Sequence, residues 1–504
     1  MGKIMIMEGG LMLAPIIVAL IYRESATNVL AFALPAVLCA GIGLLLGIPK
    51  PDRNGLYQKE GFALVALSWF VMPLFGAIPF VINGDIPSYI DAFFEITSGF
   101  TTTGASILGN VEVLAHSSLF WRSFSHWIGG MGILVFILIF IPESEDGSSM
   151  HLLRAESPGP QVGKLVSKMK ATTRILYLIY LGLTVLEVAV LMLDKPIPGH
   201  ENDQFFISLL TAFGSAGTGG FGVLNGSIQS FNPFSQYAIA VFLLLFGCNF
   251  SLYYLILIGK FKSVIKSEEL RTYLIAIVVA VGLIFLNLMG KIGAAAEIYG
   301  AEEAFRHALF QVASIITTTG YSTTDFNLWP TLGKTILVIL AFSGAMAGST
   351  AGGIKTSRIV IAVKGFGIKI RKLINPRYVP KTKIEGKVLE SNTVGDVYTF
   401  LALYAFILIG VTLLLSLDPI NGTMVEITSD MGTYQAQHGI LSNLTSALSC
   451  ISNIGPGLDA VGPYASFAGY SVFSKLLLSL TMMVGRLEIL PVLILFSPKT
   501  WKKV

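Results

Sequence analysis

Long apolar runs alternate with short polar connections along almost the whole chain, and this pattern predicts its elements. We expect a short helical pair and then four pairs of crossings, because each run can span about 30 Å of hydrocarbon as a helix. The pairs are expected near 4–22 and 29–48, 62–82 and 117–141, 172–193 and 236–260, 271–290 and 331–363, and 397–417 and 469–496. The first run also fits a signal peptide, but a second apolar run follows at once and no small-residue cleavage site stands out. We therefore expect a retained helix.

Inside each of the four later pairs lies a shorter apolar stretch that ends in a polar, glycine-containing run and never reaches a basic loop. Such a segment enters the membrane and turns back. The four stretches are 91–106, 209–222, 307–322 and 443–459, and they align on Gly104, Gly220, Gly320 and Gly455. The sequence thus predicts a fourfold repeat of outward crossing, re-entrant half-helix, glycine turn and inward crossing.

These repeats predict the domain organisation of an all-α polytopic membrane protein, with four pseudo-symmetric repeats around one pore. The expected segments are an N-terminal two-helix hairpin at 1–50 and pore repeats at 51–150, 151–265, 266–380 and 381–504, called repeats 1 to 4 below.

The glycine turns suit the passage of a cation. Irregular backbone at membrane depth is tolerated only where protein shields it or where it lines a water-filled cavity. Four turns around one axis would meet this condition, and their carbonyl and hydroxyl oxygens would replace the hydration shell of a cation. Glycine leaves no side chain in such a passage and reaches backbone angles that aim a carbonyl inward. The alternative is that four loops pack an inert interior.

A second distinctive run, "GAMAGSTAGGIKTSR" at 344–358, lies in the middle of the inward crossing of repeat 3. Its glycines and small residues predict two helices joined by a flexible loop. The glycine spacing of a phosphate-binding loop is met from Gly348 to Gly353, but Ile354 stands where the lysine belongs and no strand precedes it. We therefore reject a nucleotide site. A gate below the turns is the sharper hypothesis, and a helix-packing seam is the alternative.

Arg486 lies inside the last crossing, two residues before Glu488. An arginine at membrane depth is costly unless it faces a cavity or a partner. As a fixed positive charge beneath a cation passage it would raise the barrier to conduction. The alternative is a structural pair with Glu488 that locks two helices together.

Composition agrees with a membrane protein, since 53% of the 504 residues are hydrophobic, 13% are charged and the mean hydropathy is +0.72. The net charge is +4. Basic residues recur after every second crossing, at Lys50, Arg53 and Lys59, Lys164, Lys168, Lys170 and Arg174, Lys260, Lys262, Lys266 and Arg271, 364–387, and Lys499, Lys502 and Lys503. By the positive-inside rule these loops and both termini are expected in the cytoplasm, so the charges need no nucleic-acid partner.

An enzyme and an inert assembly or receptor subunit are the rival functions. The six histidines show no ligand spacing, and the three cysteines, all in apolar segments, show neither a disulfide framework nor a metal spacing. We therefore expect no enzyme and no cofactor in this chain.

Four motifs resemble the Trk/Ktr/HKT superfamily of potassium transporters, over essentially the whole chain. They are "HWIGGMGILVF" at 126–136, "LLRAESPGP" at 152–160, "AGSTAGGIK" at 347–355 and "VGRLEILPVLILFSPKTW" at 484–501. The extra N-terminal pair and the "GRLEI…FSPKTW" ending resemble the Trk-type membrane subunits. The resemblance implies potassium uptake in the bacterial inner membrane; the alternative is a Ktr-type sodium-dependent or less selective monovalent cation transporter.

The resemblance also implies functional residues and partners. The K⁺-binding filter would comprise Thr101, Thr102, Thr103, Gly104, Gly217, Thr218, Gly219, Gly220, Thr317, Thr318, Thr319, Gly320, Ser452, Asn453, Ile454 and Gly455. The gate would comprise Gly344, Gly348, Gly352, Gly353 and Arg486. The family forms homodimers and binds cytosolic TrkA-type nucleotide-sensing subunits, which would carry the nucleotide site because this chain lacks a dinucleotide fingerprint. Repeats 2 and 4 depart from the threonine run, so hydroxyls cannot contribute equally from all four quarters.

Overall fold

The computed structural model describes residues 1–48, 58–132, 169–293, 298–377, 382–389, 391–495, 497–498 and 500. The described part is mostly helical, as predicted. It contains six helical stretches long and apolar enough to cross a membrane, or seven if a bent pair at 233–257 counts as one span. Several sequence features lie outside the described residues, namely the crossing beyond 132, the motif at 152–160 and the basic residues Lys50, Arg53, Lys164, Lys168, Lys499, Lys502 and Lys503.

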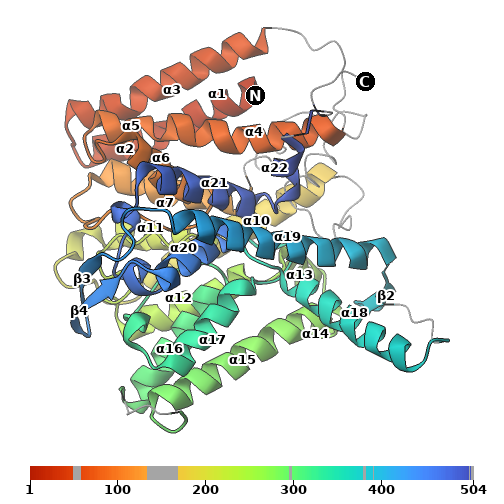
Figure 1. Ribbon diagram of the computed structural model, residues 1–504. Helices are drawn as coiled ribbons and strands as arrows, with labels where there is room; N and C mark the ends of the chain where they lie inside the picture. Colours follow the sequence, from red (N-terminus) through yellow and green to blue (C-terminus); the bar gives the residue numbers. More distant parts are fainter. Residues whose placement is uncertain are drawn as a thin grey trace.

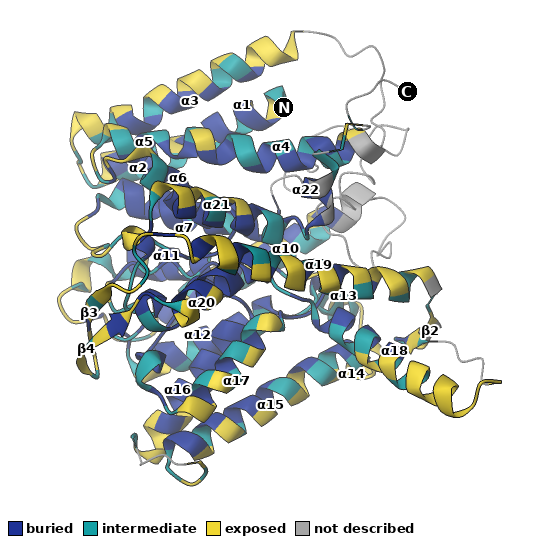
Figure 2. Ribbon diagram, viewed as in Figure 1, coloured by how far each residue is buried: buried dark blue, intermediate teal, exposed yellow. Residues whose placement is uncertain are grey.

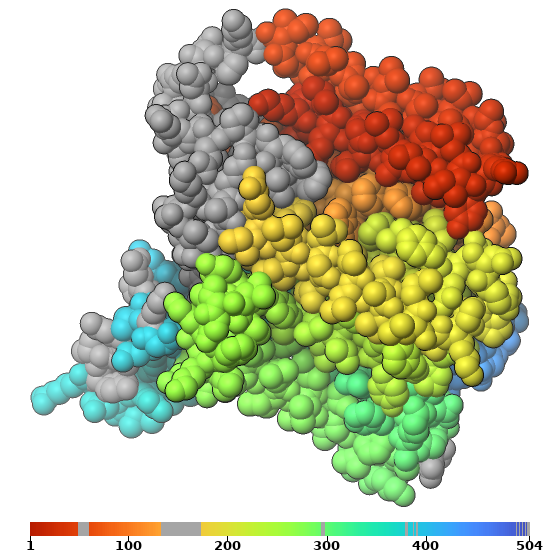
Figure 3. Space-filling view, turned by 180° about the vertical axis from the view of Figure 1, so that it is seen from behind, coloured from red at the N-terminus to blue at the C-terminus, as the bar shows by residue number. Residues whose placement is uncertain are grey.

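The N-terminal pair forms a hairpin of α1 (Gly2–Leu11), α2 (Leu13–Ile21) and α3 (Ala26–Gly47). Helices α1 and α3 approach closely because Gly2 and Gly43 face each other; a Cβ built on Gly43 would lie 2.7 Å from the carbonyl oxygen of Gly2. In Figure 1 this hairpin lies at one end of the molecule and α15 at the opposite end. Figure 3 shows the same separation from behind.

Each repeat contains the three elements predicted for it. The outward helices are α4 (Gln58–Gly76) with α5 (Ile78–Ile82), α10 (Met169–Leu191), α15 (Glu268–Leu288) and α19 (Ser391–Leu415). The re-entrant helices are α6 (Tyr89–Phe100), α11 (Gln204–Gly217), α16 (Ala301–Ile316) and α20 (Ile440–Ser452). The inward helices are α7 (His116–Gly130), α12 (Pro233–Phe246), α17 (Thr331–Phe342) and α21 (Val472–Arg486). The domain boundaries drawn from the sequence stay a prediction.

The inward crossings differ from the continuous helices that the hydropathy pattern predicts. The segment predicted as a crossing at 236–260 is not one continuous helix, because α12 and α13 (Phe250–Leu257) meet at an angle of 91°. The predicted break in repeat 3 is present, between α17 and α18 (Thr356–Ile374). In repeat 4 the left-handed residues Glu488 and Ile489 separate α21 from α22 (Leu490–Leu495). Breaks therefore recur in three inward crossings, just below the re-entrant helices.

The remaining elements are short. They are α14 (Phe261–Ile265), the 3₁₀ turns η1 (Glu201–Asp203), η2 (Phe326–Leu328), η3 (Asp459–Val461) and η4 (Phe467–Gly469), and the strands β1 (Lys383–Ile384), β2 (Lys387–Val388), β3 (Met424–Ser429) and β4 (Gly432–Gln437). β1 pairs antiparallel with β2, and β3 with β4 in the register Met424↔Gln437 to Ser429↔Gly432. The β3–β4 hairpin was not expected from the sequence.

The re-entrant helices form the centre of the fold. Figure 2 shows the buried residues gathered there, whereas exposed residues follow the outer faces of α3, α15 and α18. Nine consecutive residues of α6, from Ala92 to Phe100, are buried, and Glu95, Thr97 and Ser98 are among them. Exposed apolar outer faces are typical of helices that face lipid, and the buried polar residues among the re-entrant helices mark a candidate site within an otherwise largely apolar core.

Candidate functional site

The four re-entrant helices end in the same hydrogen-bond pattern. In each, an N–H two or three residues past the helix reaches back five residues to a helix carbonyl, which is the 6→1 bond of a Schellman cap. The bonds run from Thr103 to Ser98 (2.9 Å), Gly219 to Gly214 (2.9 Å), Thr319 to Ser314 (2.8 Å) and Ile454 to Ser449 (2.9 Å). The repeat read from the sequence is therefore also a repeat of backbone geometry.

The backbone after each helix alternates twice into the left-handed region. The first left-handed residues are Thr102, Thr218, Thr318 and Asn453, with φ between 53° and 57°. The second are Gly104, Gly220, Gly320 and Gly455, with φ between 71° and 106°. A β-branched threonine rarely adopts such angles and costs about 1–3 kcal/mol there, so its surroundings must hold it.

The four turns at 101–104, 217–220, 317–320 and 452–455 surround one point and are called the four-turn ring below. Each glycine lies against the carbonyl of the residue before the glycine of the next repeat, so that an added Cβ would meet that oxygen. The pairs are Gly104 with Gly219, Gly220 with Thr319, Gly320 with Ile454 and Gly455 with Thr103. The fourth pair returns to repeat 1, so the ring is closed.

The threonine repeats share a side-chain network as well. Thr101 donates to the carbonyl of Thr97 (2.7 Å), and its hydroxyl lies 2.8 Å from that of Thr103. In repeat 3, Thr317 bonds the carbonyl of Ala313 (2.7 Å) and lies 2.8 Å from Thr319. These hydroxyls therefore brace the turn that contains them.

Repeat 4 obtains its bracing from another residue type. The side-chain amide of Asn453 donates to the hydroxyl of Thr103 (2.9 Å) and to the carbonyl of Met482 on α21 (2.9 Å). It thereby joins the turn of repeat 4 to that of repeat 1. Asparagine also tolerates the left-handed conformation better than threonine does.

Residues 343–355, which the sequence predicts to lie within a crossing and which are called the intramembrane loop below, contact the four-turn ring. Its Gly352 N–H donates to the hydroxyl of Thr318 (2.7 Å), and a Cβ on Gly352 would overlap the carbonyl oxygen of Ser452. The loop closes on itself through the bond from the Gly344 N–H to the Ile354 carbonyl (2.8 Å). A substitution at Gly352 would therefore push the loop away from the ring.

Two further elements hold the same loop. In the broken crossing of repeat 2, the Phe250 N–H donates to the Gly348 carbonyl of the loop (3.0 Å). Glu269, near the start of α15, accepts the N–H groups of Ala347 within the loop (2.8 Å) and of Ser357 at the start of α18 (3.1 Å). Glu269 was not among the residues predicted from the sequence, although a carboxylate at the start of an apolar helix offered a signal.

Arg486 lies at the meeting point of the ring and the loop. Its guanidinium donates to the hydroxyl of Thr102 (3.1 Å) and to the loop carbonyl of Thr350 (3.0 Å). It also donates to the carbonyls of Gly129 and Gly130 at the end of α7, the second at 2.9 Å. Glu488 instead forms a salt bridge with Arg358 of α18. Arg486 thus connects repeat 1, the intramembrane loop and α21.

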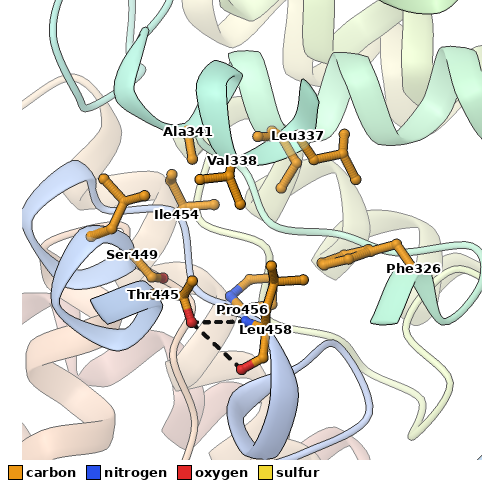
Figure 4. A pocket seen from close by; sticks show the side chains of 12 residues that line it. Phe326, Leu337, Val338, Ala341, Thr445, Ser449, Ile454, Pro456 and Leu458 are labelled. Carbon is orange, nitrogen blue, oxygen red and sulfur yellow. Dashed lines mark hydrogen bonds between the residues drawn. The ribbon is translucent and has the colours of Figure 1, made fainter. Parts of the chain in front are cut away.

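A small apolar pocket lies beside the ring, between α17 and α20 (Figure 4). Ile454 and Pro456 line it together with Leu337, Val338 and Ala341. The hydroxyl of Thr445, which also lines it, is already engaged with the N–H (3.0 Å) and carbonyl (3.5 Å) of Leu458. The pocket therefore offers little for an ion and marks looser packing between repeats 3 and 4. Among the residues that the structure describes, no group of three or more His, Cys, Asp or Glu side chains could hold a metal.

Comparison with known proteins agrees with this architecture. A family model described as "TrkH: Cation transport protein" matches residues 31–503. The chain belongs to the TrkH family of cation transport proteins. It is 32% identical, over 100% of its own length and 98% of the relative, to the "Trk system potassium uptake protein TrkH" of Salmonella typhimurium. It is 30% identical to the TrkG protein of Escherichia coli K12, over 97% of this chain and 95% of that one.

A solved TrkH structure has the same fold. The potassium transporter TrkH from Vibrio parahaemolyticus matches with a TM-score of 0.82 and 29% identity, over 99% of this chain and 98% of that one. The family resemblance and the polytopic all-α fold expected from the sequence are thereby confirmed.

Proposed function

We propose that this chain takes up potassium ions across a membrane through a passage centred on the four-turn ring. The observation that carries the proposal is the closed order of the ring, in which each glycine lies against a carbonyl of the next repeat. A ring of backbone oxygens can replace the hydration shell of K⁺. The related proteins are named as potassium uptake proteins, which supports the choice of cation.

The end of each re-entrant helix adds to this effect. The C-terminus of a helix carries about half a negative charge, and the four helices α6, α11, α16 and α20 all end at the ring. A cation entering the ring would meet favourable potential from four sides. The membrane potential would then drive uptake with about 2.3 kcal/mol per charge for each 100 mV.

The gate in this proposal is the intramembrane loop together with Arg486. The loop occupies the underside of the ring through Gly352 and Thr318, and the positive charge of Arg486 lies beside it. Both features oppose the exit of a cation toward the cytoplasm. Opening requires the loop to leave Thr318 and the guanidinium to leave Thr102.

Assembly and regulation form part of the same proposal. The relatives carry names of a Trk system, which supports a membrane component that works with further subunits. We expect a homodimer in the bacterial inner membrane, with both termini in the cytoplasm and a TrkA-type nucleotide-binding partner. No enzymatic activity is expected, because the related proteins are named as transporters.

A less selective monovalent cation transporter is the second candidate. It is favoured by the absence of the threonine run from repeats 2 and 4, which leaves hydroxyl bracing of the threonine type in only two of the four quarters.

Flux into vesicles that contain only this chain tests the proposal. We expect rubidium and potassium to enter when the interior is negative, and potassium to compete with rubidium better than sodium does. Equal competition by sodium would favour the second candidate. The absence of any cation flux from protein that elutes as one species and melts cooperatively would contradict uptake.

A further inference from the structure

Helix α7 of repeat 1 contributes a histidine to the turn of repeat 2. His126 is fully buried. Its Nδ1 lies 2.7 Å from the carbonyl oxygen of Gly99 on α6. Its Nε2 accepts the N–H of Phe221, the residue directly after Gly220 of the ring, at 3.2 Å. One imidazole therefore spans the boundary between two quarters of the four-turn ring.

These two partners fix the protonation state of the His126 imidazole. A carbonyl oxygen can only accept, so Nδ1 must carry a hydrogen. A backbone N–H can only donate, so Nε2 must be bare. Only the neutral Nδ1–H tautomer satisfies both bonds, and the imidazolium would place two N–H groups against each other at Phe221.

The imidazole also fills the space that a side chain of the turn would need. A Cβ built on Gly219 would overlap three atoms of the His126 ring. The equivalent positions in repeats 1 and 3 are Thr103 and Thr319, which carry the bracing hydroxyls. Repeat 2 thus has glycine where they have threonine because a side chain from the neighbouring repeat occupies the site.

A second residue of α7 acts on the same segment. The guanidinium of Arg122 lies 4.2 Å from the centre of the Phe221 ring, and the His126 ring lies 4.2 Å from it as well. Arg122 is itself fixed by a buried salt bridge to Glu95 (2.8 Å), whose carboxylate accepts the N–H of Ile107 (2.9 Å) beyond the turn of repeat 1. Phe221 is therefore held between two side chains of repeat 1.

We propose that His126 is a specificity-determining positioning residue, which holds the second quarter of the ring in place of the missing threonine hydroxyls. This inference rests on the proposed function, because it concerns the discrimination between K⁺ and Na⁺ at the ring. His126 does not touch the ion itself. It sets the position of the Gly219 carbonyl by filling the space behind it and by bonding the Phe221 N–H.

The test measures the K⁺/Na⁺ permeability ratio in vesicles. His126→Ala is expected to lower the ratio about tenfold while rubidium flux persists. Gly219→Thr alone is expected to abolish flux, because its side chain overlaps the imidazole. The double variant His126→Ala with Gly219→Thr is expected to return the ratio to within about threefold of the parent. His200→Ala, at the distant turn η1, is the matched control and should change nothing.

Two milder variants separate the two hydrogen bonds of the His126 imidazole. In His126→Asn, the side-chain amide can still bond the Gly99 carbonyl but is too short to reach the Phe221 N–H. The longer side chain in His126→Gln can reach Phe221. We expect Gln to preserve the ratio better than Asn, and this comparison decides the matter if His126→Ala does not fold.

The failures of the two proposals are distinguishable. An unchanged ratio in folded His126→Ala, beside a selective parent, would overturn the role of His126 and leave potassium uptake intact. A double variant no better than the single one would overturn the space-filling argument. A parent without flux would overturn the proposed function instead.

Discussion

Repeats 1 and 3 build their turns from three threonines, whereas repeats 2 and 4 reach the same backbone with other residues. The left-handed residues Thr102 and Thr318 have φ of 54° and 56°, and Thr218 and Asn453 have 53° and 57°. The bracing differs in origin, because repeats 1 and 3 use hydroxyls of their own turn. Repeat 2 is braced by His126 of repeat 1, and Asn453 of repeat 4 bonds Thr103 of repeat 1. The four turns therefore share a backbone conformation and differ in the side chains that hold it.

The threonine repeats (1 and 3) and repeat 2 also differ in the partner of the hydroxyl at the first left-handed position. The hydroxyls of Thr102 and Thr318 accept bonds from Arg486 and Gly352, which belong to the proposed gate. The hydroxyl of Thr218 bonds the carbonyl of its neighbour Gly217 at 2.6 Å. The hydroxyls of Thr102 and Thr318 therefore bond the proposed gate, whereas the hydroxyl of Thr218 bonds within its own turn.

The largest expected effect comes from a side chain placed in the ring. Gly320→Ser and Gly220→Ser should each lower the K⁺/Na⁺ permeability ratio at least tenfold, because the new Cβ overlaps a carbonyl of the next repeat. Reversal potentials in bilayers measure the ratio. Gly282→Ser is the control, since a Cβ there meets open space. An unchanged permeability ratio in Gly220→Ser would show that the turn of repeat 2 does not belong to the same ring as the turns of repeats 1 and 3.

Removing the charge below the ring should have the next largest effect. Arg486→Ala is expected to raise basal rubidium flux about tenfold, which corresponds to about 1.4 kcal/mol in the barrier. Loss of the guanidinium removes the donor that the Thr102 hydroxyl and the Thr350 carbonyl share. Arg486→Lys retains the charge and should raise flux less. Unaltered or lower flux from folded Arg486→Ala would argue for a purely structural arginine.

The contact between the ring and the gate predicts a smaller difference between the repeats. Thr318→Val and Thr102→Val should each raise basal flux about threefold, because valine keeps the shape but cannot accept from Gly352 or Arg486. Thr218→Val is the matched control and should leave the gate unchanged. Initial rates of rubidium uptake without partner subunit measure this effect. Equal changes in all three variants would remove the distinction between the classes.

The smallest effect concerns the bracing hydroxyls. Thr101→Val and Thr317→Val each remove a bond to a helix carbonyl, which contributes about 1 kcal/mol. We expect a decrease of a few degrees in the melting temperature of the detergent-solubilised protein, with the permeability ratio changed no more than about twofold. A tenfold fall in the ratio would show that hydroxyls, rather than backbone oxygens, set the selectivity.

The sequence predicted the local features of this molecule better than those that join its parts. The four glycines, the break in repeat 3 and the re-entrant helices follow from patterns within one segment, and the structure contains all of them. The functional roles of the turn and gate residues stay predictions. The bend of 91° after Phe246 was missed because an apolar run of sufficient length gives no sign of a change in direction.

The contacts between repeats were beyond the sequence for a physical reason. His126 and Phe221 are 95 residues apart, and Asn453 and Thr103 are 350 apart. No periodicity within one segment reports a pairing of that kind. His126 was not singled out from the sequence, and its partners could be named only from the folded chain.

The central claim is that the four turns, threonine-containing or not, together coordinate one cation. Anomalous scattering from crystals grown in rubidium tests it directly. The account predicts a rubidium peak on the axis of the four-turn ring, flanked by backbone oxygens from all four repeats and absent in sodium. Rubidium bound only beside the hydroxyls of repeats 1 and 3, or only outside the ring, would contradict it.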